Sequence, residues 1–130
     1  MTISMRIILA IDFSRGSERL VTEVAERSWP PGTVVRVLAV VDNAPPSAAE
    51  LLFDAGGSLE TVMRLRKDLC QHLADEATVV LRAKGLIVET SVRAGRVRRA
   101  IKEEAEQWPP DLVVARRGLR RSGFWKSLSL

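Results

Sequence analysis

The stretch MRIILAI, residues 5–11, decides the fold class of this chain. It is a continuous apolar run rich in β-branched residues, and it ends at Asp12. A strand that is apolar on both faces is typical of a parallel sheet covered by helices on each side. The run therefore predicts an α/β domain in which Asp12 follows the carboxyl end of a buried strand.

The segments after this run alternate between helical and strand patterns. Apolar residues at helical spacing predict helices over 15–28, 58–83 and 96–107, and short apolar runs predict strands over 34–41, 86–92 and 111–115. Residues 42–57 contain Pro45-Pro46 and Gly56-Gly57 and are expected to form a loop. This order predicts a doubly wound, open parallel sheet of the Rossmann-like type, with right-handed crossovers and helices on both faces.

Length and composition narrow the protein class further. A chain of 130 residues predicts a single domain spanning 1–130. One cysteine, Cys70, and one histidine, His72, exclude an internal disulfide framework and a Cys/His metal cluster. No apolar run reaches the ~18 residues of a membrane span, and the first residues do not resemble a signal peptide. We therefore expect a cytoplasmic protein without a membrane partner.

The net charge of +4 is concentrated near the C-terminus. Residues 112–130 contain no acidic residue and five basic ones, so the rest of the chain is near neutral and residues 116–130 form a basic tail. Such a tail attracts anions. A nucleic acid partner is not expected, because only Phe124 and Trp125 could stack on bases there. The basic residues are Arg116, Arg117, Arg120, Arg121 and Lys126.

No group of residues has the spacing of a catalytic site. The adjacent carboxylates Glu103 and Glu104 lie near Arg99 and Lys102 on an expected helix, which favours surface ion pairs over acid–base chemistry. Cys70 lies on an apolar helix stripe and is expected to be a small buried hydrophobe. The Walker loop of nucleotide hydrolases is absent. We therefore expect that the protein is not an enzyme.

Four segments together resemble the universal stress protein family. Ile11-Asp12-Phe13-Ser14 is similar to the V-D-x-S opening of that family, and the other segments are 37–42 (VLAVVD), 88–95 (VETSVRAG) and 100–114. The resemblance covers nearly the whole chain. It implies a Rossmann-like fold of the adenine-nucleotide alpha-hydrolase-like type. It also implies a cytoplasmic stress-response module that binds ATP with Mg²⁺ and acts as a homodimer or other oligomer.

The resemblance also implies residues for the nucleoside part of the ligand. Asp12 would accept hydrogen bonds at the ribose or adenine end, and Val40 would line the adenine slot. Each residue has a structural alternative: Asp12 could cap the following helix together with Ser14, and Val40 could be a core valine. Gly95 is expected to supply a turn with positive φ rather than a ligand contact.

The phosphate-binding pattern of the family matches this chain only in part. The pattern is G-x-x-G, nine residues, then G-[S/T], in which glycine lets backbone N–H groups approach phosphates beside a helix N-terminus. Here Ala115, Gly118, Leu128 and Ser129 occupy its positions. Two of the three glycines are therefore replaced. This leaves open an alternative function, a regulatory or interaction protein of the same fold that binds no nucleotide.

The family pattern continues with a helix and a final strand, which are expected to be missing here. The strand over 111–115 would then be an unprotected edge of the sheet, unless the tail or another chain pairs with it.

Overall fold

Five parallel strands form the sheet, in the order β3-β2-β1-β4-β5. The computed structural model describes residues 4–12, 16–54, 56–115 and 127–129. The strands are β1 (Arg6–Ile11), β2 (Val34–Val41), β3 (Ile87–Ala94), β4 (Leu112–Ala115) and β5 (Ser127–Ser129). Chain order runs outward from β1 to β3 and then changes direction at β4. The doubly wound parallel sheet predicted from the sequence is therefore confirmed.

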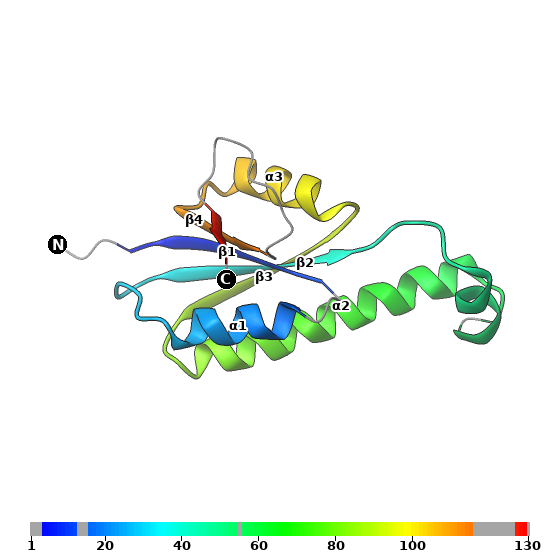
Figure 1. Ribbon diagram of the computed structural model, residues 1–130, viewed down its shortest axis with the longest axis horizontal. Helices are drawn as coiled ribbons and strands as arrows, with labels where there is room; N and C mark the ends of the chain where they lie inside the picture. The colour runs from blue at the N-terminus through cyan, green and yellow to red at the C-terminus, as the bar shows by residue number, and fades with distance from the viewer. Residues whose placement is uncertain (1–3, 13–15, 55, 116–126, 130) are drawn as a thin grey trace.

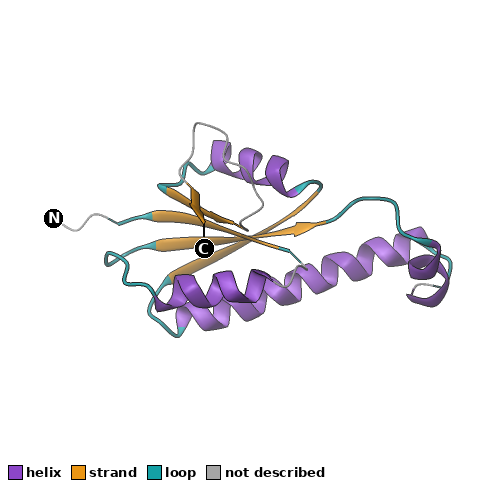
Figure 2. Ribbon diagram, in the orientation of Figure 1, coloured by secondary structure: helices purple, strands orange, loops and turns teal. Residues whose placement is uncertain are grey.

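Helices cover both faces of the sheet, as expected. Helices α1 (Gly16–Glu26) and α2 (Leu59–Arg82) lie on one face, and α3 (Val97–Gln107) lies on the other (Figures 1 and 2). The long helix α2 extends past the ends of the strands, where the short π-helical turn η1 (Glu50–Asp54) lies against it (Figure 1). Ser58 caps α2 by accepting a hydrogen bond from the Thr61 N–H at 3.2 Å.

The core is split between the two faces of β1. Ile7, Leu9 and Ile11 point into the cluster under α1 and α2, whereas Ile8 and Ala10 point into the cluster under α3. Successive side chains of a strand alternate between faces, so a run that is apolar throughout fits a strand buried on both sides. Each fully buried aliphatic side chain of this kind contributes about 1.5–3 kcal/mol of hydrophobic stabilisation.

The sheet contains a final strand that the sequence analysis did not expect. β5 pairs with β4 in parallel, with Val113 aligned to Ser127 and Ala115 to Ser129. Residues of the tail therefore pair with β4, which is one of the possibilities that the sequence analysis stated for this edge, and the two edge strands of the described sheet are β3 and β5. Three residues are too few for a periodic pattern. Pairing nevertheless satisfies the backbone groups of β4 that would face solvent.

The expectation of surface ion pairs for Glu104 is wrong. This residue is only 2% exposed and accepts three hydrogen bonds on the α3 face of the sheet. Arg93 Nε donates to it at 2.6 Å, Arg36 Nη1 at 2.9 Å and the Ser91 hydroxyl at 2.9 Å. The Arg36 guanidinium also stacks 4.4 Å from the ring centroid of Trp108. A helix residue with exposed charged neighbours thus connects α3 to β2 and β3 through a buried ion network.

Candidate functional site

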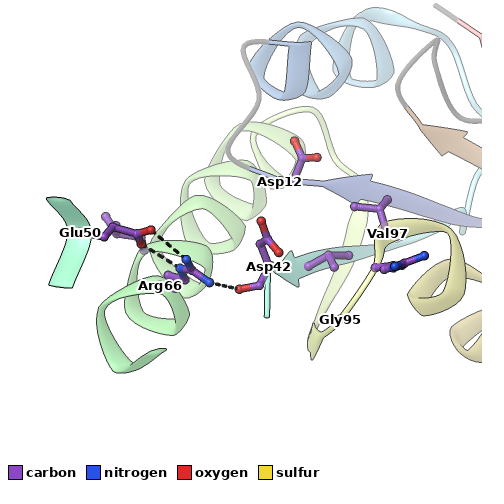
Figure 3. A pocket seen from close by; sticks show the side chains of 9 residues that line it. Asp12, Asp42, Glu50, Arg66, Gly95 and Val97 are labelled. Atoms are coloured by element: carbon purple, nitrogen blue, oxygen red, sulfur yellow. Dashed lines mark hydrogen bonds and ion pairs between the residues drawn. The ribbon is translucent and has the colours of Figure 1, made fainter. Parts of the chain in front are cut away.

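A pocket of about 590 Å³ opens at the carboxyl ends of β1, β2 and β3. Doubly wound sheets bind ligands beyond the carboxyl ends of their strands, and small-molecule sites usually measure about 300–1,000 Å³. In Figure 3, Asp12, Asp42 and Gly95 lie at the strand ends around this space, and Val97 lies at the start of α3. The pocket is lined by Asp12, Val40, Asp42, Glu50, Arg66, Leu69, Gly95, Arg96 and Val97.

Asp12 is held at the pocket wall by the start of α1. Its backbone N–H donates to the Ser17 hydroxyl at 3.0 Å, and that hydroxyl donates to Asp12 Oδ1 at 3.3 Å. The side chain therefore interacts with the beginning of the helix, as the structural alternative from the sequence proposed, although with Ser17. Ser14 lies outside the described residues. Asp12 lines the pocket as well, so both interpretations remain compatible with its position.

Val40 lines the pocket, and the buried Cys70 contacts the backbone of Val40. Val40 is a core valine that packs on the α3 side of the sheet, and its place in the pocket lining is compatible with the role that the resemblance implies. The Cys70 thiol, on α2, donates to the Val40 carbonyl oxygen at 3.4 Å and is completely buried. The sequence-based interpretation of Cys70 as a buried hydrophobe is confirmed. Burial raises the pKa of the Cys70 thiol, and the negative charge of Asp12 raises this pKa further.

Cys70 should resist thiol reagents in the folded protein. The thiolate is the reactive form, and both burial and the raised pKa disfavour it. We expect labelling by a soluble disulfide reagent at pH 8 to be at least about 100-fold slower in buffer than in 6 M urea. Cys70 is the single cysteine, so the assay needs no mutant. Rapid stoichiometric labelling in buffer would contradict the burial of Cys70.

Arg66 of α2 binds the segment of residues 42–50, which forms one side of the pocket. Its Nε and Nη2 each donate to the Glu50 carboxylate at 3.0 Å, and Nη1 donates to the carbonyl oxygens of Asp42 at 2.7 Å and Ala44 at 2.8 Å. Two-point arginine–carboxylate contacts are strong and directional. The hydrogen bond from Arg66 lowers the pKa of Glu50, which keeps the pair charged at neutral pH. One side chain thus holds both ends of the segment 42–50 (Figure 3).

Sequence reasoning missed Arg66 and Glu50. One signal was present: Arg66 lies four residues after Val62 and four before Cys70, so a cation interrupts the buried face of a helix. Nothing in the sequence indicates its partner, because Glu50 lies sixteen residues away, in a segment that the sequence analysis expected to be a loop and that forms the turn η1.

Replacing Arg66 with methionine should loosen the loop of residues 42–58 without unfolding the domain. The substitution removes four hydrogen bonds to this segment and keeps the apolar stem of the side chain. We expect chymotrypsin to cleave after Leu51, Leu52 or Phe53 at least about tenfold faster. The cleavage rate follows the fraction of molecules in which this segment is locally unfolded, and the substitution increases that fraction. Arg64→Met changes an exposed arginine on the same helix and is the matched control. Equal cleavage rates for wild type, control and variant would refute the role of Arg66.

Gly95 adopts the turn conformation that the sequence predicted. Its φ is +129°, and its N–H donates to the Val41 carbonyl oxygen at 2.9 Å. Residues other than glycine rarely adopt such a φ. The turn directs the chain from β3 into α3, so that the beginning of α3 borders the pocket at Arg96 and Val97.

Comparison with known proteins identifies the family. The model of the universal stress protein family matches residues 4–124. The chain belongs to this family. No curated protein sequence is significantly similar to the chain.

Solved structures share the universal stress protein fold with this chain. The hypothetical protein PH0823 is 23% identical, with a TM-score of 0.70, and the match covers 97% of this chain and 95% of that chain. A family member from Arabidopsis thaliana with AMP bound is 13% identical, with a TM-score of 0.64, over 97% and 90% of the two chains. A universal stress protein in complex with cAMP is 16% identical, with a TM-score of 0.56, over 97% and 96%.

Of the positions that match the family's phosphate pattern, Ala115 and Ser129 lie among the residues that the structure describes. Ala115 ends β4, is 6% exposed, and does not belong to the described lining of the pocket. Ser129 lies in β5 opposite Ala115, and not at the start of a helix as the pattern predicted. Gly118 and the arginines beside it fall outside the described residues. The structure therefore brings Asp12 and Val40 together, and separately Ala115 and Ser129.

Two further expectations concern metals and membranes. Within the described ranges, no cluster of three or more His, Cys, Asp or Glu side chains is placed to hold a metal ion. The described helices also include none that is long and apolar enough to span a bilayer.

Proposed function

We propose that this universal stress protein binds an adenine nucleotide, ATP with Mg²⁺, in the pocket at the carboxyl ends of β1 to β3. It would act as a cytoplasmic stress-response module, through a dimer and without catalysing a reaction. The observation that carries the proposal is that Asp12 and Val40, which sequence resemblance assigned to the nucleoside, line the same pocket. The AMP and cAMP complexes of proteins with this fold support an adenine nucleotide as the ligand class.

The chemistry of the pocket suits the nucleoside part of such a ligand. Val40, Leu69 and Val97 offer apolar contacts to a base. The Asp12 carboxylate accepts hydrogen bonds, and the two hydroxyls of a ribose are donors of the right kind for a charge-assisted pair. Glu50 is neutralised by its ion pair with Arg66, whereas the Asp42 carboxylate also lines the pocket, so the phosphates would extend away from Asp42. In the sequence, the basic segment that begins at Arg116 follows β4 and is the candidate for the phosphate side.

A second function is favoured by one specific observation. The methyl group of Ala115 is buried at the end of β4, where the family's phosphate pattern has glycine. A side chain at this position obstructs a close approach of phosphate to the backbone. On this alternative, the protein keeps the fold and acts as an interaction module without a nucleotide.

A thermal melt separates the two functions. A ligand that binds only the folded state stabilises it by about 2.7 kcal/mol at 100 times its Kd, which corresponds to an upward shift of several degrees in Tm. We expect this shift with Mg-ATP, and a smaller one with Mg-GTP as the matched base control. A cooperative melt that neither nucleotide shifts would reject nucleotide binding and favour the interaction module.

A further inference from the structure

The side chains of Asp42 and Arg96 are both available to a ligand of the pocket. Both line the pocket and are exposed. Asp42 Oδ1 accepts a hydrogen bond from the Ala44 N–H at 2.8 Å, which fixes the orientation of the carboxylate. Among the described residues, no donor binds Asp42 Oδ2 and no acceptor binds the Arg96 guanidinium. Arg66, the other arginine of the pocket, already donates from all three of its side-chain nitrogens.

These two side chains begin at the neighbouring ends of β2 and β3. The Gly95 N–H donates to the carbonyl oxygen of Val41, the last residue of β2, at 2.9 Å. Asp42 directly follows Val41 in the chain, and Arg96 directly follows Gly95. Neighbouring strands lie about 4.8 Å apart. The pocket therefore has a hydrogen-bond acceptor beside a hydrogen-bond donor at this edge.

This edge of the pocket faces the base in the proposed nucleotide complex. In that complex the ribose lies at Asp12 and the phosphates extend toward β4, so the base extends toward β2 and β3, which lie on the other side of β1. Ile11 is aligned with Ala39, so Asp42 is one strand across from Asp12 and two residues further along. Their Cα atoms are therefore about 8 Å apart, a distance that a ribose and its attached purine span. In Figure 3, the Asp42 carboxylate points toward the side of the pocket where Asp12 lies.

Adenine has the hydrogen-bonding pattern that complements this acceptor and donor. Its 6-amino group donates, and the ring nitrogen beside that group accepts. We propose that Asp42 and Arg96 select adenine in this pocket: Asp42 Oδ2 accepts a hydrogen bond from the 6-amino group, and Arg96 donates to the adjacent ring nitrogen. Guanine and hypoxanthine carry an oxygen at position 6, which places two acceptors against each other. This selection rests on the proposed function, and it adds the side chains that distinguish ATP from 6-oxopurine nucleotides.

Asp42→Asn should shift the preference of the pocket toward an oxygen at position 6 of the base. Oδ1 keeps its hydrogen bond from the Ala44 N–H, so the amide Nδ2 replaces Oδ2 and turns an acceptor into a donor. Inosine triphosphate (ITP) is the probe, because it carries an oxygen in place of the 6-amino group. In calorimetric titrations with Mg²⁺, the wild type should bind ATP at least about tenfold more tightly than ITP, and the variant should shift this ratio toward ITP at least about tenfold. A loosened pocket would weaken the binding of both nucleotides and would not produce this shift.

Arg96→Met tests the second contact with the base. The substitution keeps an apolar stem, removes the donors and should weaken ATP binding at least about tenfold. Arg98→Met is the matched control, because Arg98 is an exposed arginine of α3 outside the described lining of the pocket, and it should leave ATP binding unchanged. An ATP-to-ITP ratio that Asp42→Asn does not change, or equal ATP affinity in the two arginine variants, would overturn the selection while the nucleotide site stands. A wild type that binds neither nucleotide rejects the proposed function, and the selection with it.

Discussion

Replacing Glu104 with alanine should destabilise the domain by about 3–5 kcal/mol. The carboxylate is 2% exposed and accepts hydrogen bonds from Arg36, Arg93 and Ser91. Its removal leaves the guanidinium groups of Arg36 and Arg93 without the negative charge that they share. Both groups are partly buried, so water cannot fully replace the carboxylate. Breaking a buried ion network by removing one member is far more costly than losing an exposed pair. For a domain of this size, the expected fall in Tm is about 10–20 °C.

Glu103→Ala is the matched control for this substitution. Glu103 precedes Glu104 in the same helix, but its side chain is 46% exposed and its ion pairs with Arg93 and Arg99 are longer, 3.5 Å and 3.3 Å. The control should lose less than about 1 kcal/mol in urea unfolding. Similar losses in the two variants would show that the network at Glu104 is not the main link between α3 and the sheet.

The same network predicts acid sensitivity. Burial by itself raises the pKa of Glu104, but the hydrogen bonds from Arg93, Arg36 and Ser91 outweigh it and lower this pKa from the ordinary value of 4.5. A carboxyl whose folded pKa is lowered stabilises the protein above its unfolded pKa, and this stabilisation is lost as the pH falls through the folded pKa. The free energy of unfolding should therefore fall below pH 4.5 in the wild type, and less steeply in Glu104→Ala.

Replacing Asp12 with alanine should weaken adenine nucleotide binding at least about 100-fold, or about 2.8 kcal/mol. In the proposed complex, the Asp12 carboxylate accepts hydrogen bonds from the ribose hydroxyls. Its removal leaves these hydroxyl donors without a partner in the pocket. Isothermal titration with Mg-ATP measures the change directly. The Tm of the variant should be measured in parallel, because the Asp12 carboxylate also accepts a hydrogen bond from the Ser17 hydroxyl at 3.3 Å.

Asp75→Ala provides the control for Asp12. Asp75 is an exposed carboxylate on α2 that accepts a hydrogen bond from Gln71, and it does not line the pocket. Its removal changes the net charge by the same amount, so it separates a general charge effect from a local contact. If nucleotide binds the wild type and Asp12→Ala retains full affinity, the assignment of Asp12 to the ligand is wrong.

The strongest sequence patterns predicted the parts of the fold that depend on local chemistry. The apolar run predicted β1 because a strand buried on both faces needs apolar residues throughout. Gly95, just before α3, was predicted to form a turn because glycine readily adopts a positive φ. Asp12 was found for a related reason, since it directly follows the most apolar strand. Its position at the pocket wall was therefore predictable from its place in the chain.

The parts that sequence reasoning missed depend on contacts between distant residues. Arg66 and Glu50 meet only because α2 extends past the sheet and the loop folds back onto it. Glu104 resembles its charged neighbours in the sequence, and its burial follows from how α3 is rotated against β2 and β3. β5 was missed because its pairing partner, β4, lies eleven residues before it, and three residues carry too little pattern.

The most direct test of a nucleotide site at the ends of β1 to β3 is an amide NMR titration of the wild-type protein with Mg-ATP. We predict saturable shifts that are largest at Asp12, Val40 and Gly95, with Val97 at the start of α3 also affected. The pocket at the other end of the sheet, around residues 28–33, provides the internal comparison and should change little. Shifts concentrated at residues 28–33, or no saturable shifts at millimolar nucleotide, would contradict the account.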